Sequence, residues 1–101
     1  MEIKKTTSEG IVTIALKGRL DTTTTPSLEA ELKESVFDIA SGLVLDCAEL
    51  EYVSSAGLRV ILAAQKAMNK QGKMVIKNVN DTIMEVFEIT GFIDILTIEK
   101  D

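Results

Sequence analysis

The sequence predicts a single-domain α/β protein with a mixed, mostly parallel sheet and helices packed on it. Two observations support this prediction: alternating residues at the start suggest a β-hairpin, and the rest of the chain alternates short apolar segments with helical patterns. The chain has 101 residues, 46% of them hydrophobic, which is enough for one core. It contains no internal repeat, low-complexity segment or linker, so we expect one domain over residues 1–101.

The first two strands are expected at residues 3–7 and 11–16, where apolar and polar residues alternate. Residues 8–10 between them, Ser-Glu-Gly, favour a tight turn, so the two strands are expected to form a hairpin. A polar loop is expected to follow over residues 19–25.

The first helix is expected to begin at Pro26, because the fixed φ of proline suits the first helical position. Thr25 would be its N-cap. Apolar side chains spaced three and four residues apart continue as far as Ala40. Gly42 is then expected to end the helix.

Two apolar segments without polar alternation, residues 43–45 and 74–76, are expected to be central strands covered on both faces. The first of them is expected to stop at Asp46. A second helix is expected between the two strands, over about residues 56–70, because its apolar side chains fall on one stripe. Gly72 would be its C-cap.

A third helix is expected to open at residues 80–81, where Thr82 and Glu85 have the spacing of a capping box, and to end by Gly91. The isoleucine-rich residues 93–98 fit a last strand. The expected order is therefore β-β-α-β-α-β-α-β. Neighbouring strands joined through a helix run parallel, because such crossovers are right-handed connections over one face of the sheet.

Composition and charge argue against several classes of function. The net charge of −5, without a basic run interleaved with aromatic residues, disfavours binding to nucleic acid. No apolar stretch approaches the ~20 residues that span a bilayer, and the N-terminus lacks an apolar signal core, so we expect a cytoplasmic protein without membrane insertion. The single cysteine, Cys47, cannot form an internal disulfide and is expected to be buried.

The sequence contains no histidine, which removes the commonest general base and the usual metal ligand. We therefore expect neither an enzyme nor a metal site, and no cofactor. Asp21, Asp46 and Ser55 can converge near one sheet edge in the predicted order. Carboxylates at loop ends, however, are usually capping or solvated groups, so this convergence is weak support for catalysis.

The candidate site lies in the segment DCAELEYVSSAGLRV, where Ser54 or Ser55 must occupy the N-cap region of the second helix. One interpretation is structural: a serine caps the helix, and Gly57 permits close packing. The other is functional, because sites of such folds lie at the C-terminal edge of the parallel sheet. There the helix N-terminus tolerates a phosphate on the serine, while the added charge disturbs any partner covering that surface.

Three segments resemble a known family: VTIALKGRLDTTTTPSLEAEL, LVLDCAELEYVSSAGLRVIL and VFEITGFIDIL. They span nearly the whole chain, which resembles a stand-alone STAS domain of the anti-sigma factor antagonist family. The resemblance implies that Ser55 is the phosphorylated serine, with Ala56, Gly57 and Leu58 continuing the motif. Many members have an aspartate where this chain has Ser54, and a hydroxyl where it has Ala56, so Ser54 remains the alternative acceptor.

The resemblance also implies partner switching. The unmodified antagonist binds an anti-sigma factor that is itself a serine/threonine kinase of the GHKL-type ATPase fold, and a sigma factor is freed to regulate transcription. The phosphorylated antagonist is released, and a PP2C-type phosphatase restores it. The loop with Arg19, Asp21, Thr22 and Thr23 is expected to join the serine motif in the partner surface. For Asp21 the alternative is a carboxylate that only caps its loop.

Two further alternatives remain open. A non-catalytic STAS subunit can act as a permanent scaffold in a transporter or a sensory complex, and the fold alone does not separate that role from a switch. A homodimer can form through an exposed apolar patch near the C-terminus, although such residues are more often core, so we expect a free monomer. The patch would comprise Phe87, Phe92 and Ile93.

Overall fold

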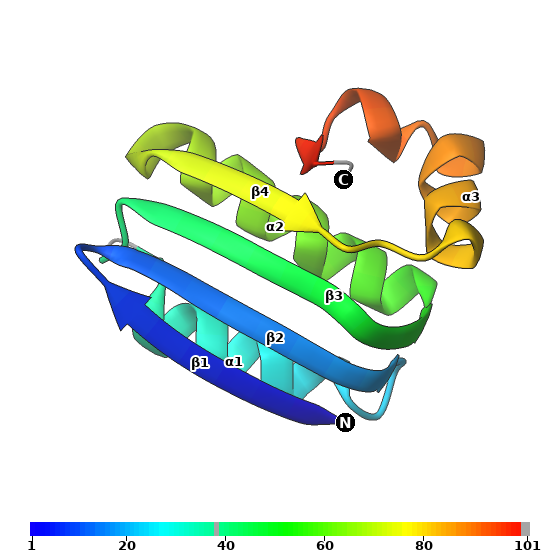
Figure 1. Cartoon of the computed structure of the whole chain (residues 1–101), viewed down its shortest axis with the longest axis horizontal. Coiled ribbons are helices and arrows are strands. Elements are labelled where there is room, and N and C mark those ends of the chain that lie inside the picture. Colours follow the sequence, from blue (N-terminus) through cyan, green and yellow to red (C-terminus); the bar gives the residue numbers. More distant parts are fainter. Residues whose placement is uncertain (38, 100–101) are drawn as a thin grey trace.

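The computed structural model describes residues 1–37 and 39–99, and these form one layer of strands and one layer of helices (Figure 1). Within them the elements follow in the predicted order, with one added 3₁₀ turn, η1, before the last strand. The elements are β1 (Glu2–Ser8), β2 (Ile11–Leu20), α1 (Thr25–Ser35), β3 (Gly42–Val53), α2 (Ser55–Gln71), β4 (Lys73–Lys77), α3 (Asp81–Thr90), η1 (Phe92–Asp94) and β5 (Ile98–Glu99).

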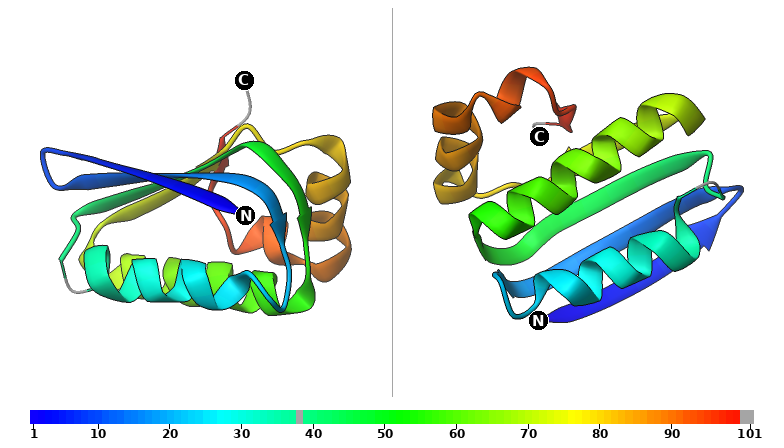
Figure 2. Two further views of the ribbon diagram at one scale, coloured as in Figure 1. Left: turned by 90° about the horizontal axis from the view of Figure 1, so that it is seen from below. Right: turned by 180° about the vertical axis from the view of Figure 1, so that it is seen from behind.

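The strands form a single mixed sheet in the order β1-β2-β3-β4-β5. β1 is antiparallel to β2, and all later neighbours are parallel, so the predicted mixed and mostly parallel sheet is confirmed. Figure 2 shows α1 and α2 side by side on one face of the sheet, whereas α3 follows the end of β4 and stands apart from them. The opposite face of β1, β2 and β3 carries no helix in these views. The prediction that the apolar runs at residues 43–45 and 74–76 are covered on both faces is therefore wrong, and Val44 and Val75 in the middle of these runs are only half-buried.

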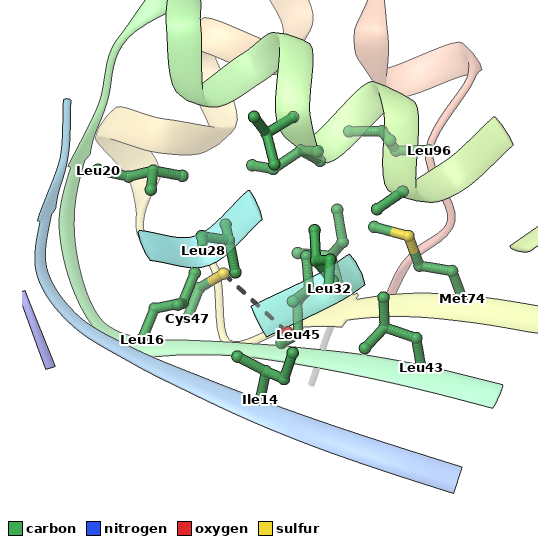
Figure 3. Packing of buried hydrophobic residues seen from close by; sticks show 14 of the residues in the cluster. Ile14, Leu16, Leu20, Leu28, Leu32, Leu43, Leu45, Cys47, Met74 and Leu96 are labelled. Atoms are coloured by element: carbon green, nitrogen blue, oxygen red, sulfur yellow. Dashed lines mark hydrogen bonds between the residues drawn. The ribbon is translucent and has the colours of Figure 1, made fainter. Parts of the chain in front are cut away.

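The core lies between the sheet and the two helices on its covered face. Ile14 and Leu45 from the strands and Leu32 from α1 are each at most 1% exposed (Figure 3). Cys47 belongs to the same cluster, so its predicted burial is confirmed, and burial raises the pKa of its thiol to about 12. Phe87 is fully buried as well, so it does not contribute to an exposed apolar patch.

Several local predictions are confirmed. Glu9 and Gly10 have φ values of 52° and 82°, the left-handed pair that a two-residue hairpin turn requires. The second helix begins within one residue of its predicted start and ends at the predicted Gly72. Gly91 ends α3 in the left-handed conformation, at φ 79°.

β2 and β3 are longer than predicted: the second strand was expected to end at residue 16, and the third at Asp46. β3 continues to Val53, and its later buried residues recur every third position, at Cys47, Leu50 and Val53, without strict alternation. Bulges in the pairing with β2, between Ala15 and Lys17 and again at Gly18, explain this drift. The predicted strand end at Asp46 is therefore wrong.

The first helix ends at Ser35, and the predicted continuation toward Gly42 is wrong. Val36 and Ala40 are buried as their spacing suggested, but they reach the core from turns. The carbonyl oxygens of both residues accept hydrogen bonds from Gln71 Nε2, at 2.9 and 2.8 Å. Ile39, also counted on the helical stripe, is 67% exposed.

The predicted caps of α1 and α3 are also wrong. Thr24, and not Thr25, precedes α1, and its side chain makes no cap hydrogen bond. The predicted opening of α3 at residues 80–81 is confirmed, but its cap differs from the prediction. Asn80 is the N-cap, because its Oδ1 accepts from the Ile83 amide at 2.8 Å, so the Thr82–Glu85 capping box is wrong.

The expected last strand over residues 93–98 is wrong for most of its length. Residues Phe92–Asp94 form the 3₁₀ turn, and only Ile98 and Glu99 pair with β4. Phe92 and Ile93 are half-buried and pack against the core. Over residues 1–37 and 39–99, no helix is long and apolar enough to cross a membrane.

Candidate functional site

The candidate site lies where β2 and β3 end side by side. Leu20 and Val53 are partners at the end of the parallel ladder, and the Ser54 amide donates to the Leu20 carbonyl at 2.8 Å. The loop after β2 and the start of α2 are therefore joined at the C-terminal edge of the sheet, visible at the right of Figure 1. This is the edge at which parallel sheets place their sites.

Ser54 is the N-cap of α2. Its backbone is extended, with φ −84° and ψ 172°, and its Oγ accepts a hydrogen bond from the Gly57 amide at 3.2 Å. The side chain therefore satisfies one of the free amides of the first helical turn. This is the structural role that the sequence allowed for either serine.

Ser55 is the first residue of α2, and its side chain is exposed. No other described residue forms a hydrogen bond with its hydroxyl, and the first turn of the helix has no acidic side chain. The hydroxyl therefore stands in solvent at the positive end of a 17-residue helix. The two serines are thus distinct: one side chain is engaged in the cap and the other is free.

Gly57 fixes how closely the start of α2 approaches the sheet. A Cβ at this position would lie 2.8 Å from Leu20 Cγ and 3.1 Å from Val53 Cγ1, so only glycine fits without movement of the core. Leu58 is 7% exposed and belongs to the buried core. Gly57 and Leu58 therefore fix the position of Ser55 but expose almost no surface to a binding partner. Ala56 beside them is half-buried.

Asp21 organises the loop that faces the serines. Its Oδ1 accepts from the Thr23 hydroxyl at 2.7 Å, from the Thr23 amide at 3.0 Å and from the Thr24 amide at 3.1 Å. These hydrogen bonds, the Thr23 hydroxyl above all, lower the pKa of the carboxyl group. The geometry matches the loop-capping interpretation of Asp21. It also leaves Thr22 and Thr23 exposed at the surface.

Thr24 ties this loop to the end of β2. Its hydroxyl donates to the Arg19 carbonyl at 2.7 Å and accepts from the Asp21 amide at 2.9 Å. Thr25 also donates its hydroxyl to the Asp21 carbonyl. The loop is therefore held by hydrogen bonds among its own polar groups and to the end of β2.

An exposed aromatic residue, Tyr52, lies beside the site and was missed from the sequence. The Arg19 guanidinium stands 4.5 Å from the centre of its ring, a cation–π distance, and the two residues are neighbours across β2 and β3. Tyr52 is 40% exposed although it is large and partly apolar. Its position two residues before Ser54 could have indicated that Tyr52 lies near the site. It was missed because β3 was not expected to extend beyond Asp46.

Asp46 is not part of the site, so the expected convergence of Asp21, Asp46 and Ser55 is wrong. Asp46 lies in the middle of β3, seven positions before Val53 in the sequence, and pairs with Lys77 of β4. Its Oδ1 accepts from Asn78 Nδ2 at 2.9 Å, the main cause of its lowered pKa. A shallow hollow of about 80 Å³ next to it is lined by residues of β1, β2 and β3 and includes neither serine.

The sequence matches the STAS domain family over residues 2–101. The chain is a STAS domain. Among the curated relatives of this STAS domain, the protein BtrV of Bordetella bronchiseptica is 37% identical over 91 residues, covering 89% of this chain and 78% of the relative. The anti-sigma-B factor antagonist of Listeria monocytogenes is 33% identical over 103 residues, covering 99% of this chain and 88% of the relative.

Solved structures share the fold of this STAS domain at lower sequence identity. An anti-sigma factor antagonist from Mycobacterium paratuberculosis has a TM-score of 0.86 and 21% identity, over 96% of this chain and 83% of the other. The Bacillus cell fate determinant SpoIIAA in its phosphorylated form has a TM-score of 0.77 and 18% identity, over 97% and 91%. A sulfate transporter family protein from Wolinella succinogenes has a TM-score of 0.74 and 17% identity, over 91% and 75%.

Proposed function

We propose that this STAS domain is an anti-sigma factor antagonist that works by partner switching. In its unmodified form it binds an anti-sigma factor that is also a serine kinase, and phosphorylation releases it. The names of its curated relatives support the class of protein. The observation that supports the mechanism is the free, exposed hydroxyl of Ser55 beside the engaged hydroxyl of Ser54.

The covalent step uses ATP as the phosphoryl donor. Ser55 Oγ attacks the γ-phosphorus, the bond to the β–γ bridging oxygen breaks, ADP leaves, and the hydroxyl proton passes to a base on the kinase. A PP2C-type phosphatase reverses the modification: water attacks the phosphorus, inorganic phosphate leaves, and the serine regains a proton. The STAS domain is the phosphoryl acceptor in the first step and, as phosphoserine, the substrate whose bond from phosphorus to Ser55 Oγ breaks in the second. It is acted on by other proteins in both steps, so we propose that it is not an enzyme. Because the proposed kinase step consumes ATP, we propose that the switch operates in the cytoplasm.

The energetics favour an effect on the complex over an effect on the fold. A phosphate adds about −1.5 to −2 charges at pH 7. At the N-terminus of α2 this charge meets the positive end of the helix dipole, an interaction worth about 0.3–1 kcal/mol in favour of the modified fold. A partner docked over Ser55 and the loop of Arg19, Asp21, Thr22 and Thr23 instead has to accommodate a buried dianion. Loss of such complementarity costs about 2–5 kcal/mol of binding.

Mass spectrometry tests the acceptor. The protein is incubated with ATP and a cognate serine kinase, and its peptides are mapped. We expect one phosphate on Ser55, abolished in Ser55→Ala and retained in Ser54→Ala. Phosphate on Ser54, or no modification by any kinase that binds the protein, would contradict the proposal.

Binding experiments separate the switch from a permanent scaffold, the role that the transporter-family neighbour suggests. Ser55→Asp is expected to weaken binding to the anti-sigma kinase, measured by calorimetry, by at least tenfold. Ser8→Asp is the matched control, because Ser8 is exposed at the hairpin turn, at the opposite end of β2 from the site. Under the scaffold alternative, both variants bind the permanent partner as well as the unmodified protein does.

A further inference from the structure

We propose that Arg59 is the internal counter-ion of the phosphate on Ser55. This inference rests on the proposed phosphorylation of Ser55 and adds the residue that receives the phosphate within the domain. In the unmodified protein the Arg59 guanidinium would have no ion-pair partner. After phosphorylation it would form an ion pair with the phosphate on Ser55 of the same helix.

Helix geometry places the two side chains together. Ser55 and Arg59 are four residues apart in α2, which brings their Cβ atoms to about 5–6 Å on the same face of a helix. Both residues are exposed, so neither is held in the core. The acidic group would lie N-terminal to the basic one, the order in which such pairs are more favourable. A planar guanidinium can also bind two phosphate oxygens at once.

Arg59 has no competing partner among the residues that the structure describes. The three ion pairs found there use Lys5, Lys17 and Lys33. α2 itself contains three basic residues and no acidic one, in a chain whose net charge is −5. The guanidinium is therefore available to a new anion on the same face.

The neighbouring elements do not offer a better counter-ion. Arg19, the other arginine of the chain, is held over the Tyr52 ring at 4.5 Å. Asp21, the acidic group of the adjoining loop, does not compete with the phosphate for Arg59, because its Oδ1 accepts from Thr23 and Thr24 and the described ion pairs do not include it. Lys66 and Lys70 are exposed on α2 too, but they lie two and three turns beyond Arg59.

Pairing would give the switch a second component. Phosphorylation then adds negative charge at Ser55 and also withdraws the Arg59 guanidinium from the surface. An acidic group on the partner, attracted to Arg59 in the unmodified protein, would lose that contact when the phosphate forms. The modified surface would present a partly neutralised pair in place of an isolated dianion.

The test uses the full chain with phosphoserine inserted at position 55 during translation, so that no kinase is needed. The second pKa of the phosphate is measured by ³¹P NMR titration. We expect Arg59→Gln to raise that pKa by roughly 0.3, the shift that corresponds to a helical pair of this spacing. Arg59→Lys should retain part of the effect. Lys66→Gln is the matched control, because it removes one positive charge from the same helix two turns beyond Arg59, and it should change the pKa by less than roughly 0.1.

A second measurement tests whether Arg59 only stabilises the fold and does not pair with the phosphate. The melting temperature is measured with and without the phosphate in both backgrounds, and the phosphate should raise it by roughly 2 °C more when Arg59 is present. Equal pKa values in the Arg59 and Arg59→Gln proteins, or a larger shift in Lys66→Gln, would overturn the inference. Either result would leave the kinase assay on Ser55 unaffected, so the two proposals fail separately.

Discussion

Replacing Gly57 with alanine should destabilise this protein, although the same change in an ordinary helix is stabilising. Alanine is favoured over glycine in a helix interior by about 1 kcal/mol. Here the added Cβ would lie 2.8 Å from Cγ and 2.9 Å from Cδ2 of Leu20, a side chain with no exposed surface. Because Leu20 is packed on all sides, relief of this overlap requires either its displacement or a shift of α2.

The magnitude follows from two opposing terms. Over-packing of a tight core site costs about 1–3 kcal/mol, and the helix preference of alanine returns about 1 kcal/mol. The expected net loss in the free energy of unfolding is about 1 kcal/mol. For a domain of 101 residues, this corresponds to a melting temperature lower by about 5 °C.

Urea denaturation followed by circular dichroism measures this loss, and the Leu20→Ala background provides the decisive comparison. Leu20→Ala alone should cost about 2–5 kcal/mol, because it leaves a cavity beside Gly57. In that background the overlap with Leu20 is removed and only the 3.1 Å approach to Val53 Cγ1 remains, so Gly57→Ala should become stabilising by up to about 1 kcal/mol. If Gly57→Ala instead stabilises the protein with Leu20 intact, the close approach of α2 to the sheet is not what requires glycine.

Two further predictions concern the site. Ser54→Ala should cost about 1 kcal/mol of stability through the lost cap, whereas Ser55→Ala should change it by less than about 0.5 kcal/mol; equal losses in thermal melts would refute the assigned roles. The lowered pKa of Asp21 means that its carboxylate stabilises the fold above the unfolded-state pKa, with a contribution that is lost as pH falls through the folded-state value. Asp21→Asn should therefore reduce the drop in stability between neutral and acidic pH, and an unchanged pH profile in urea titrations would contradict this.

Local sequence signals were sufficient where one chemical feature decides the backbone. The hairpin turn at residues 8–10 and the helix end at Gly91 both depend on residues that adopt positive φ, and these were predicted correctly. Apolar runs likewise marked β4 and the start of β3, although helices cover only one face of the sheet and Val44 and Val75 are half-buried on the other. The order of elements and the mixed sheet followed from these signals.

The same signals failed where long-range pairing decides. The second half of β3 lacks alternation, and its strand conformation depends on hydrogen bonds to β2 across bulges. The end of α1 was predicted wrongly because Val36 and Ala40 are buried in the core although they lie after the helix. Their carbonyl oxygens accept hydrogen bonds from Gln71, which is 31 residues beyond Ala40 in the sequence. Asn80 also donates to the Leu50 carbonyl, a contact that selects it over Thr82 as a cap and that has no local signature.

For the site, the sequence alone determined which serines to consider, because a helix had to begin at Ser54 or Ser55 after a strand of a parallel sheet. That the loop of Arg19, Asp21, Thr22 and Thr23 would join them was implied by the family resemblance. Only the tertiary structure divided the roles of Ser54 and Ser55, since both occupy a possible cap position and the helix start depends on how Gly57 packs against Leu20 and Val53. Only the tertiary structure also excluded Asp46 from the site. Asp46 lies in the middle of β3, and the length of β3 is not determined by local residues.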